Sequence, residues 1–402
     1  MKHLADLPVN VIAGSSLANL QCKPLSPYSP EAIAFLSEWS QKLIRHSEIR
    51  THPDVASFAF WCREGNLVQL SRDFAQKKLR LGRGLALHIA PTNVPVNFAY
   101  SFAFGLLAGN ANVVRVPESL PAQAKFLCTI ADQLLADPKH ARVVSMTTLI
   151  SYPRDDAVTK RLSAMADVRI LWGGDQTIEN LRRMPTSPRC VDIPLADRYS
   201  LCLLSAPAVL AAAGSDFAAL ITGFYNDAFI MDQNACSSPH LVLWQGNLEE
   251  VTAAQDRFWG ALHSFAGNRG NMLAIQAVEK YTHLCRFAIG HEGAISAPVV
   301  TTRIVRVSLE HLPDDITSYR GRNGFFVESL DADLSQLFRI VNSRYQTLTC
   351  FGFDLNTIAQ QVASNGSLGI DRVVSVGNAL NINVIWDGFD IIGTMSRIIA
   401  TT

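Results

Sequence analysis

The chain has 402 residues, of which 48% are hydrophobic and 17% are charged, and its 35 Lys and Arg balance 35 Asp and Glu. This length and apolar content predict a large globular protein of two or three domains. Because balanced charge provides no basic surface field, we expect neither nucleic acid nor an anionic membrane as a partner.

The eight cysteines are typical of a protein from a reducing compartment. No two have CxxC spacing, and no group of Cys and His has the spacing of zinc ligands, so we expect neither a disulfide framework nor a metal site. The N-terminus carries no apolar signal core, and no apolar run is long enough to span a bilayer. A cytoplasmic protein without a membrane span is expected.

Residues 1–80 are predicted to be mainly helical, and a different pattern begins at residue 84. Strands are predicted at 85–90, 112–116, 143–149, 168–172 and 201–205, with helices between them at 96–108, 120–136, 154–165 and 176–183. These strands are apolar nearly throughout, and a helix follows each of the first four. The pattern therefore predicts a parallel sheet covered on both faces, as in an open Rossmann-like domain.

A second α/β unit is predicted after this domain. Its strands are expected at 241–245, 301–308, 324–329, 346–353 and 372–377, and its helices at 207–224, 248–290, 331–343 and 355–364. The expected domains are residues 1–203, residues 204–380, and a tail of residues 381–402 with a short strand. We expect the tail to return to the first domain or to form an oligomer interface.

Small and polar residues surround Cys236 in the stretch Asn234-Ala235-Cys236-Ser237-Ser238-Pro239. The stretch lies between an amphipathic segment and a strand pattern, so Cys236 is expected in a loop on a rigid scaffold, where chemistry is often placed. Its small neighbours leave room for a carbonyl group to approach the sulfur. By position alone a buried structural cysteine is the commoner case, so both interpretations stay open.

A rigid turn, Pro91-Thr92-Asn93-Val94-Pro95, follows the first strand of the predicted parallel sheet. Two prolines stiffen the turn, and the Asn93 carboxamide is then a fixed donor of the kind that forms an oxyanion hole. An Asx turn or a helix N-cap is the commoner role of such an Asn.

Two further motifs follow the second and fourth strands. Glu118 lies where a carboxylate commonly meets a ribose hydroxyl, and Arg115 suits a 2′-phosphate, although Glu118 also fits the first turn of a helix. Gly173-Gly174 would let a diphosphate approach the backbone, or would simply form a turn. His240 opens a strand and is expected to point away from Cys236.

The order of these motifs resembles the aldehyde dehydrogenase superfamily over residues 84–355. The blocks 90–95, 172–174, 234–239 and 386–388 together resemble its acyl-CoA reductase branch, the LuxC-type fatty-acid reductases. The resemblance implies an aldehyde dehydrogenase-like fold with a cofactor domain and a catalytic domain. It implies that Cys236 is the catalytic thiol and Asn93 the oxyanion donor, and that the cofactor contacts are Arg115, Glu118, Pro91, Thr92, Gly173 and Gly174.

The resemblance implies NADPH-dependent reduction of an acyl thioester, either acyl-CoA or acyl-protein, to an aldehyde through an acyl-cysteine. NADH stays possible because Glu118 suits a free 2′-hydroxyl. Oxidative members of the superfamily carry a water-activating Glu in a Glu-Leu-Gly-Gly block, where this chain has Ile193-Pro194-Leu195-Ala196. A second family Glu, which holds the nicotinamide ribose, is missing near residues 321–324.

Two alternatives remain open at this stage. The first is an aldehyde dehydrogenase that works in the oxidative direction, against which the missing Glu argues. The second is a non-catalytic binding protein on the same fold, against which the joint presence of Cys236, Asn93, Arg115 and Glu118 argues. For the reductase, an acyl-transferring or acyl-activating enzyme is an expected partner, and a homo-oligomer is expected.

Overall fold

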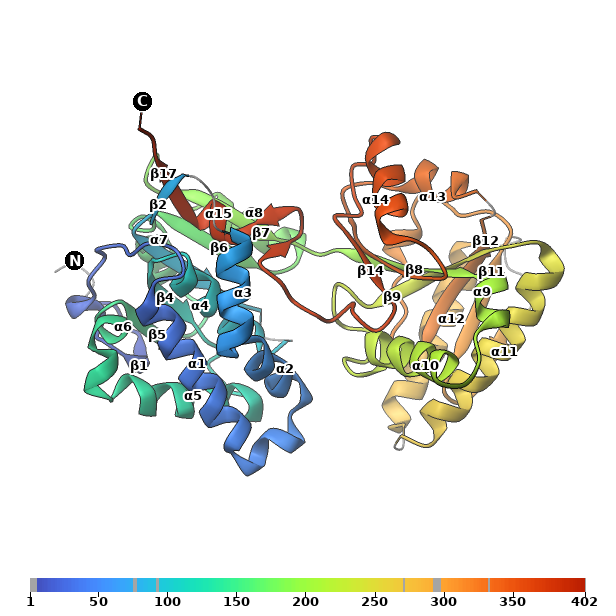
Figure 1. The fold of residues 1–402 in the computed structure, drawn as a ribbon, viewed down its shortest axis with the longest axis horizontal. Coiled ribbons are helices and arrows are strands. Elements are labelled where there is room, and N and C mark those ends of the chain that lie inside the picture. The colour runs from blue at the N-terminus through green and yellow to red at the C-terminus, as the bar shows by residue number, and fades with distance from the viewer. Residues whose placement is uncertain are drawn as a thin grey trace. The chain divides into compact units, whose positions relative to one another are not determined.

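The computed structural model describes residues 6–74, 78–91, 94–269, 272–291, 298–331 and 333–401. The chain forms two compact units, Met1–Ala196 with Asn383–Thr402 and Asp197–Ile382. Figure 1 shows that each unit contains its own sheet with helices packed around it. The boundary lies between β7 (Val191–Leu195) and β8 (Tyr199–Ser205), whereas the expected domain limit at residue 203 falls inside β8.

A six-stranded sheet with the order β1-β5-β4-β3-β6-β7 organises the first unit. Its parallel strands are β3 (Leu85–Ile89), β4 (Ala111–Arg115), β5 (Thr147–Ser151), β6 (Val168–Trp172) and β7, and β1 (Asn10–Gly14) is an antiparallel edge strand. The central strands are almost wholly buried, as strands of a sheet covered on both faces must be. The predicted parallel α/β sheet is confirmed.

The helices of the first unit pack on this sheet and on one another. They are α1 (Pro30–Arg45), α2 (Pro53–Trp61), α3 (Glu64–Phe74), α4 (Asn97–Leu107), α5 (Ala122–Leu135), α6 (Ala141–Ser145), α7 (Asp156–Ser163) and α8 (Asp175–Arg182). Every residue of α4 is buried, because α4 lies between the sheet and α1. Edge-to-face aromatic contacts join the neighbouring helices; Trp39 of α1 and Phe58 of α2, for example, have ring centroids 5.0 Å apart.

Several strands of the first half differ from the predictions, and β1 lies in a region that was predicted to be mainly helical. The strand predicted at 143–149 begins only at Thr147, because residues 141–145 form α6. β7 was not predicted; it contains Pro194, which an edge strand tolerates since one side of it forms no ladder. β8, predicted as the last strand of the first sheet, lies instead at the centre of the second sheet.

A seven-stranded sheet with the order β10-β11-β12-β9-β8-β13-β14 organises the second unit. The other strands are β9 (Pro239–Gln245), β10 (Val299–Val300), β11 (Val305–Leu309), β12 (Phe325–Leu330), β13 (Tyr345–Phe351) and β14 (Arg372–Ser375). All neighbours are parallel except β10 and β11. The amino ends of β8, β9, β12 and β13 therefore meet at one edge of the sheet.

Helices cover both faces of the second sheet. One face packs against α9 (Ala206–Ala211), α10 (Gly214–Phe229) and α11 (Leu248–Gly267), and the other against α12 (Ala274–Gly290), α13 (Ser335–Ile340) and α14 (Leu355–Ser364). Alternation along β8 sends Leu201 and Leu203 to one core and Cys202 and Leu204 to the other. The single helix predicted at 248–290 is two helices, α11 and α12.

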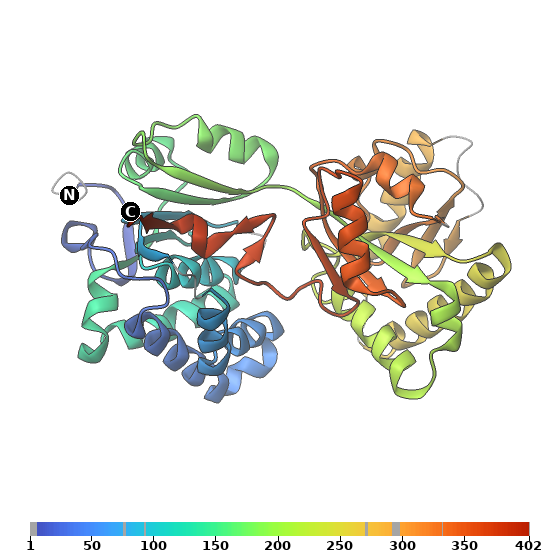
Figure 2. The same cartoon turned by 45° about the horizontal axis from the view of Figure 1, so that its top comes forward.

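The C-terminal segment belongs to the first unit. It contains β15 (Ile385–Trp386), β16 (Phe389–Asp390), α15 (Ile391–Met395) and β17 (Ser396–Ile399), and β17 pairs antiparallel with β2 (Leu79–Gly82). Figure 2 shows this red segment beside the sheet of the first unit. Asn110 Nδ2 donates to the Met395 carbonyl at 3.0 Å, and Arg83 Nε donates to the Thr394 carbonyl at 2.6 Å.

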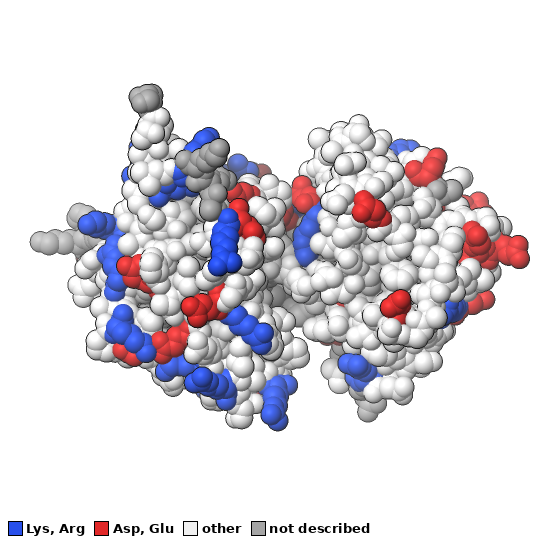
Figure 3. All heavy atoms as spheres, viewed as in Figure 1, with Lys and Arg blue, Asp and Glu red and all other residues white. Residues whose placement is uncertain are grey.

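Charged side chains of both signs are mixed on one face of the molecule (Figure 3). On the face that Figure 3 shows, Lys and Arg are interspersed with Asp and Glu on each unit. Within the described residues, no helix has both the length and the apolar character needed to cross a membrane.

Candidate active site

Cys236 lies in a tight loop that joins α10 to β9, at the amino edge of the second sheet. Two non-glycine residues of this loop, Asp232 and Gln233, have left-handed backbone conformations with φ of 49° and 57°. Such conformations cost roughly 1–3 kcal/mol each and persist only where surrounding contacts hold them. The loop therefore needs strong anchors.

Gln233 is the first of these anchors, and its side chain is buried. Its Oε1 accepts hydrogen bonds from the backbone N–H groups of Gly324 at 2.7 Å and Phe325 at 3.1 Å. Its Nε2 donates to the carbonyls of Pro239 at 3.1 Å and Phe325 at 3.0 Å. One carboxamide thus fastens the loop to the amino ends of both β9 and β12.

A second anchor runs from the loop to α10. Ser238 Oγ donates to the Asp227 carbonyl at 2.8 Å, and the Asp227 carboxylate accepts from the N–H groups of Gly377 at 2.6 Å and Ala379 at 2.9 Å. Burial raises the pKa of Asp227 to about 6, while the two backbone donors oppose that rise. Contacts within the protein therefore hold the loop on two sides.

The Cys236 thiol is partly buried and faces a side-chain amide from β13. Gln346 Nε2 donates to Cys236 Sγ at 3.4 Å, and the Gln346 side chain is fully buried. Ser200 Oγ donates to the Cys236 carbonyl at 2.7 Å and accepts from the Thr347 N–H at 3.1 Å. A donor on the sulfur favours the thiolate, which is the reactive form of cysteine.

Gln346 was not among the predicted site residues. It lies 110 positions from Cys236 and meets it only because β13 pairs with β8, beside the cysteine loop. Its one signal in the sequence is a carboxamide near the start of a predicted strand.

His240, four residues after Cys236, lies on β9 and is buried. Its ring stacks on Tyr199 with centroids 5.4 Å apart, and it forms a hydrogen bond with the Gly321 backbone. Burial, helped by the charge of Arg320, lowers the pKa of His240 to about 3. A histidine that stays neutral down to such a pH is a packing residue here and not a proton acceptor matched to neutral pH.

The other predicted site residues belong to the first unit. Pro91, Arg115 and Gly173 follow or end the neighbouring strands β3, β4 and β6, in which Ile89 pairs with both Arg115 and Leu171. The structure thus brings these three positions to one carboxyl edge, the edge at which open parallel sheets bind ligands. Thr92 and Asn93 lie outside the described residues.

Arg115 is held in place at this edge. Its guanidinium lies 4.6 Å above the Tyr152 ring, and Nη2 donates to the Tyr152 carbonyl at 3.4 Å. Among the described residues, buried Nε has no hydrogen-bond partner, which suits an anionic ligand. Glu118 is exposed to solvent in the loop that follows.

Gly173 and Gly174 form the turn that enters α8, and Gly174 is its N-cap. A Cβ atom at Gly174 would meet no other atom within 4 Å, so this turn is open on its outer side. An open backbone at a helix N-terminus can accommodate a phosphate group.

One carboxylate of β7 lies beside the segment where the water-activating Glu is missing. Asp192 is bound by the buried Arg169 through two hydrogen bonds, Nε to Oδ1 at 2.7 Å and Nη2 to Oδ2 at 2.6 Å. One guanidinium thus engages both oxygens of this carboxylate. Asp192 is therefore a structural partner of Arg169.

Comparison with solved structures defines the class of the fold. The chain is similar to an NAD-dependent benzaldehyde dehydrogenase from Corynebacterium glutamicum, with a TM-score of 0.60 and 14% identity over 93% of this chain and 85% of that one. A salicylaldehyde dehydrogenase from Pseudomonas putida G7 matches with a TM-score of 0.61 and 15% identity over 92% of this chain and 85% of that one. The protein has the fold of the aldehyde dehydrogenase superfamily.

Sequence comparison then finds similarity to one branch of this superfamily. Residues 70–266 match the model of the family described as acyl-CoA reductase (LuxC). The long-chain acyl-protein thioester reductase of Aliivibrio fischeri is 28% identical over 206 residues, 49% of this chain and 40% of that protein. The Vibrio harveyi enzyme of the same name is 28% identical over 170 residues, 42% of this chain and 33% of that protein. Over these residues the chain is similar to the LuxC-type branch, in line with the resemblance, and its match spans less than half the length of these relatives.

Proposed function

We propose that this protein reduces an acyl thioester to an aldehyde through an acyl-cysteine on Cys236. The observation that carries the proposal is the 3.4 Å hydrogen bond from Gln346 Nε2 to Cys236 Sγ, in a loop that Gln233 clamps to two strands. A partly buried thiol with a fixed donor is prepared to act as a thiolate nucleophile.

The first half of the reaction is acyl transfer. The Cys236 thiolate attacks the thioester carbonyl, a new C–S bond forms, and the bond to the carrier sulfur breaks. The carrier leaves as a thiolate, which takes a proton from water. Asn93 is the proposed donor to the oxyanion, together with the Cys236 backbone N–H, in line with the family resemblance. The anchors on Gln233 and Ser238 hold the loop that carries the sulfur.

The second half needs a nicotinamide cofactor, which supplies hydride when bound. Arg115, with its unsatisfied Nε, suits the phosphates of such a dinucleotide, as does the turn at Gly173 and Gly174, which is open at Gly174. Pro91, Thr92 and Glu118 complete the proposed contacts. NADPH is the proposed cofactor because Arg115 suits a 2′-phosphate, and NADH is the alternative because Glu118 suits a free hydroxyl.

Two features support reduction over hydrolysis of the acyl-cysteine. The segment 193–196 has no acidic side chain, and Asp192 beside it is occupied by Arg169. No carboxylate of β7 is therefore available to activate water. The acyl group on the sulfur then awaits hydride.

The roles of the two units and the protein's partners are part of this proposal. The first unit, with the C-terminal segment, would bind the cofactor, and the second would carry the acyl group. The donor is acyl-CoA or an acyl-protein, because relatives of this chain are named for acyl-protein thioesters. An acyl-transferring or acyl-activating enzyme would deliver it, and we propose a cytoplasmic homo-oligomer.

Acyl trapping tests the function directly. The protein is incubated with a long-chain acyl-CoA without cofactor, and the peptide that carries residue 236 is analysed by mass spectrometry. We expect the acyl mass on Cys236, its loss on addition of NADPH, and release of aldehyde. Cys236→Ala should abolish both steps, whereas Cys285→Ala, at an exposed cysteine of α12, should leave them intact. Thioester reduction by Cys236→Ala would refute the assignment.

A further inference from the structure

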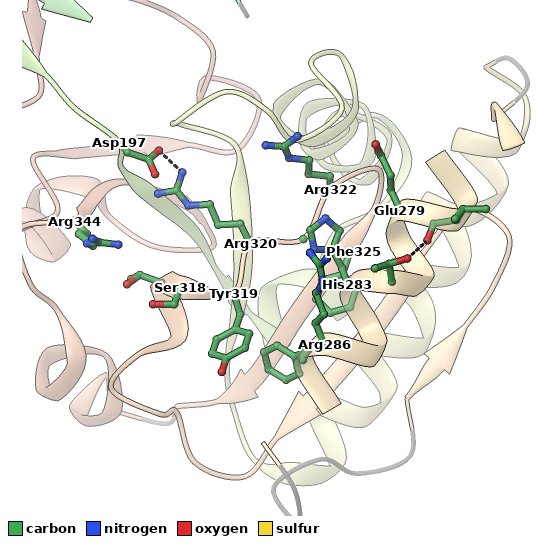
Figure 4. A pocket seen from close by; sticks show the side chains of 15 residues that line it. Asp197, Glu279, His283, Arg286, Ser318, Tyr319, Arg320, Arg322, Phe325 and Arg344 are labelled. Atoms are coloured by element: carbon green, nitrogen blue, oxygen red, sulfur yellow. Dashed lines mark hydrogen bonds and ion pairs between the residues drawn. The ribbon is translucent and has the colours of Figure 1, made fainter. Parts of the chain in front are cut away.

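A large cavity opens in the second unit beside α12 and the loops that precede β12 and β13. Its volume is about 710 Å³, and the residues that line it come from α12, residues 317–325, Asp197 and Arg344. Figure 4 shows side chains from these separate segments around one space. Cavities of this size hold ligands of the size of a small organic molecule or larger.

Arginine dominates the charge of this cavity. Four arginines line it, Arg286, Arg320, Arg322 and Arg344, against two carboxylates. Both carboxylates have partners: Asp197 Oδ1 binds Arg320 at 2.5 Å, and Glu279 Oε2 accepts from Asn323 Nδ2 at 3.0 Å. Within the part of the chain that the structure describes, Arg286 and Arg322 form no ion pair. The cavity therefore has an excess of positive charge.

His283 lies on the wall of the cavity between Arg286 and Arg322 (Figure 4), so its pKa is sensitive to their positive charge. Burial lowers the pKa of His283, and the charges of Arg322 and Arg286 lower it further. Glu279 is the carboxylate whose charge opposes this lowering of the His283 pKa. An anion placed there would relieve the repulsion among these side chains.

The cavity adjoins the cysteine loop through two residues. Phe325 lines the cavity, and its N–H donates to Gln233 Oε1, three residues before Cys236. Arg344 also lines it, two residues before Gln346, whose amide donates to Cys236 Sγ. The cavity and the thiol thus lie at the same amino edge of the second sheet.

We propose that this cavity binds the phosphate groups of a ligand, and that this ligand is the phosphate-bearing carrier of the acyl thioester. The inference rests on the proposed function, which places a thioester at Cys236. Planar guanidinium groups bind phosphate oxygens through paired hydrogen bonds, and arginines from several elements suit a ligand with more than one phosphate. A nicotinamide dinucleotide also carries a diphosphate, so it is the other ligand that could provide the phosphate groups.

Substrates with and without phosphate separate the two sources. Acylation of Cys236 is measured without cofactor, using an acyl-CoA and the N-acetylcysteamine thioester of the same acyl group, which has no phosphate. For the double variant Arg286→Gln with Arg322→Gln, we expect acylation by acyl-CoA to fall roughly a hundredfold, about tenfold per charge-assisted contact. Acylation by the phosphate-free thioester should be unchanged. The matched control removes two exposed charges outside the cavity, Arg269→Gln with Arg339→Gln, and should behave as wild type.

Binding measurements keep this test independent of catalysis. Inorganic pyrophosphate is titrated by calorimetry and NADPH by fluorescence. Pyrophosphate affinity should fall at least tenfold in the Arg286 and Arg322 double variant only. If the double variant binds NADPH more weakly but is acylated by acyl-CoA at the wild-type rate, the assignment to the acyl carrier is wrong and the cavity binds the dinucleotide. Unchanged pyrophosphate affinity would overturn the phosphate site. If wild type accepts neither thioester, the proposed function fails, and the pyrophosphate result still decides the site.

Discussion

The carboxamide of Gln346 donates a hydrogen bond to the sulfur of Cys236 over 3.4 Å, although 110 positions separate them. Parallel pairing of β13 with β8 brings the amide to the loop that precedes β9. Because the donor is buried and the sulfur partly so, the contact favours the thiolate more than it would in water.

Gln346→Leu should therefore raise the pKa of the Cys236 thiol and slow acylation about tenfold, since a hydrogen bond to a charged group contributes roughly 1.5–3 kcal/mol. The pH dependence of alkylation by iodoacetamide measures the shift directly, because only the thiolate reacts. A profile identical to that of wild type would show that Gln346 only fills space.

Gln233→Leu should destabilise the second unit by about 3–5 kcal/mol, because it leaves buried backbone groups of β9 and β12 without partners. Urea unfolding measures the loss. Gln360→Leu, at an exposed position of α14, is the control and should change stability by less than about 0.5 kcal/mol. Equal stability of the two variants would contradict the anchoring role.

The pKa of buried His240 gives a pH prediction. It falls from 6.5 to about 3 on folding, so below pH 6.5 the unfolded chain binds a proton that the folded protein does not. The folded protein is therefore destabilised, through His240, as the pH falls from 6.5 toward 3. His240→Phe keeps a ring against Tyr199 and removes this titration. Between pH 7.5 and 4.5, wild type should lose roughly 2–3 kcal/mol more stability than the variant.

Urea unfolding of both proteins across this pH range provides the measurement. Parallel pH dependences would show that His240 is not held neutral by the fold. Because a neutral, stacked ring is no general base, the pH profile of Cys236 acylation should be the same in both proteins.

Asn110→Ala should detach the C-terminal segment from the first unit. Asn110 is buried; its Oδ1 accepts from the N–H groups of Arg83 at 2.6 Å and Gly84 at 3.1 Å, and its Nδ2 donates to Met395. Loss of these bonds should cost about 2–4 kcal/mol and speed amide hydrogen exchange in β17. Arg397→Ala, at an exposed site on β17, should leave exchange unchanged. Unaltered exchange in Asn110→Ala would contradict this role.

Arg115→Gln should lower kcat/KM for NADPH about tenfold and leave kcat/KM for NADH nearly unchanged, because only NADPH carries the 2′-phosphate. Steady-state kinetics with the two cofactors at a fixed acyl-CoA concentration make the comparison. Equal losses with both would place Arg115 on a group that the two cofactors share.

Much of this architecture follows from local sequence patterns. The buried runs at β3, β4, β6, β9 and β13 are apolar enough to be predicted as strands, and the parallel α/β class follows from the helices between them. Short edge strands such as β1 and β7 were missed, because one unpaired side lets polar residues and Pro194 remain in them. The register of β8 in the second sheet was also missed, since pairing partners far apart in sequence leave no local signal.

The sequence by itself carried the family resemblance, through three motifs in a fixed order: the proline-flanked turn around Asn93, the glycine pair at 173–174 and the block around Cys236. It also indicated the proposed nucleophile, because the resemblance carried by these motifs implies that Cys236 is the catalytic thiol. Only the tertiary structure decided what surrounds that nucleophile. Gln346, Gln233 and the arginines of the cavity meet through parallel strand pairing and loop packing, which depend on long-range contacts that no local stretch encodes.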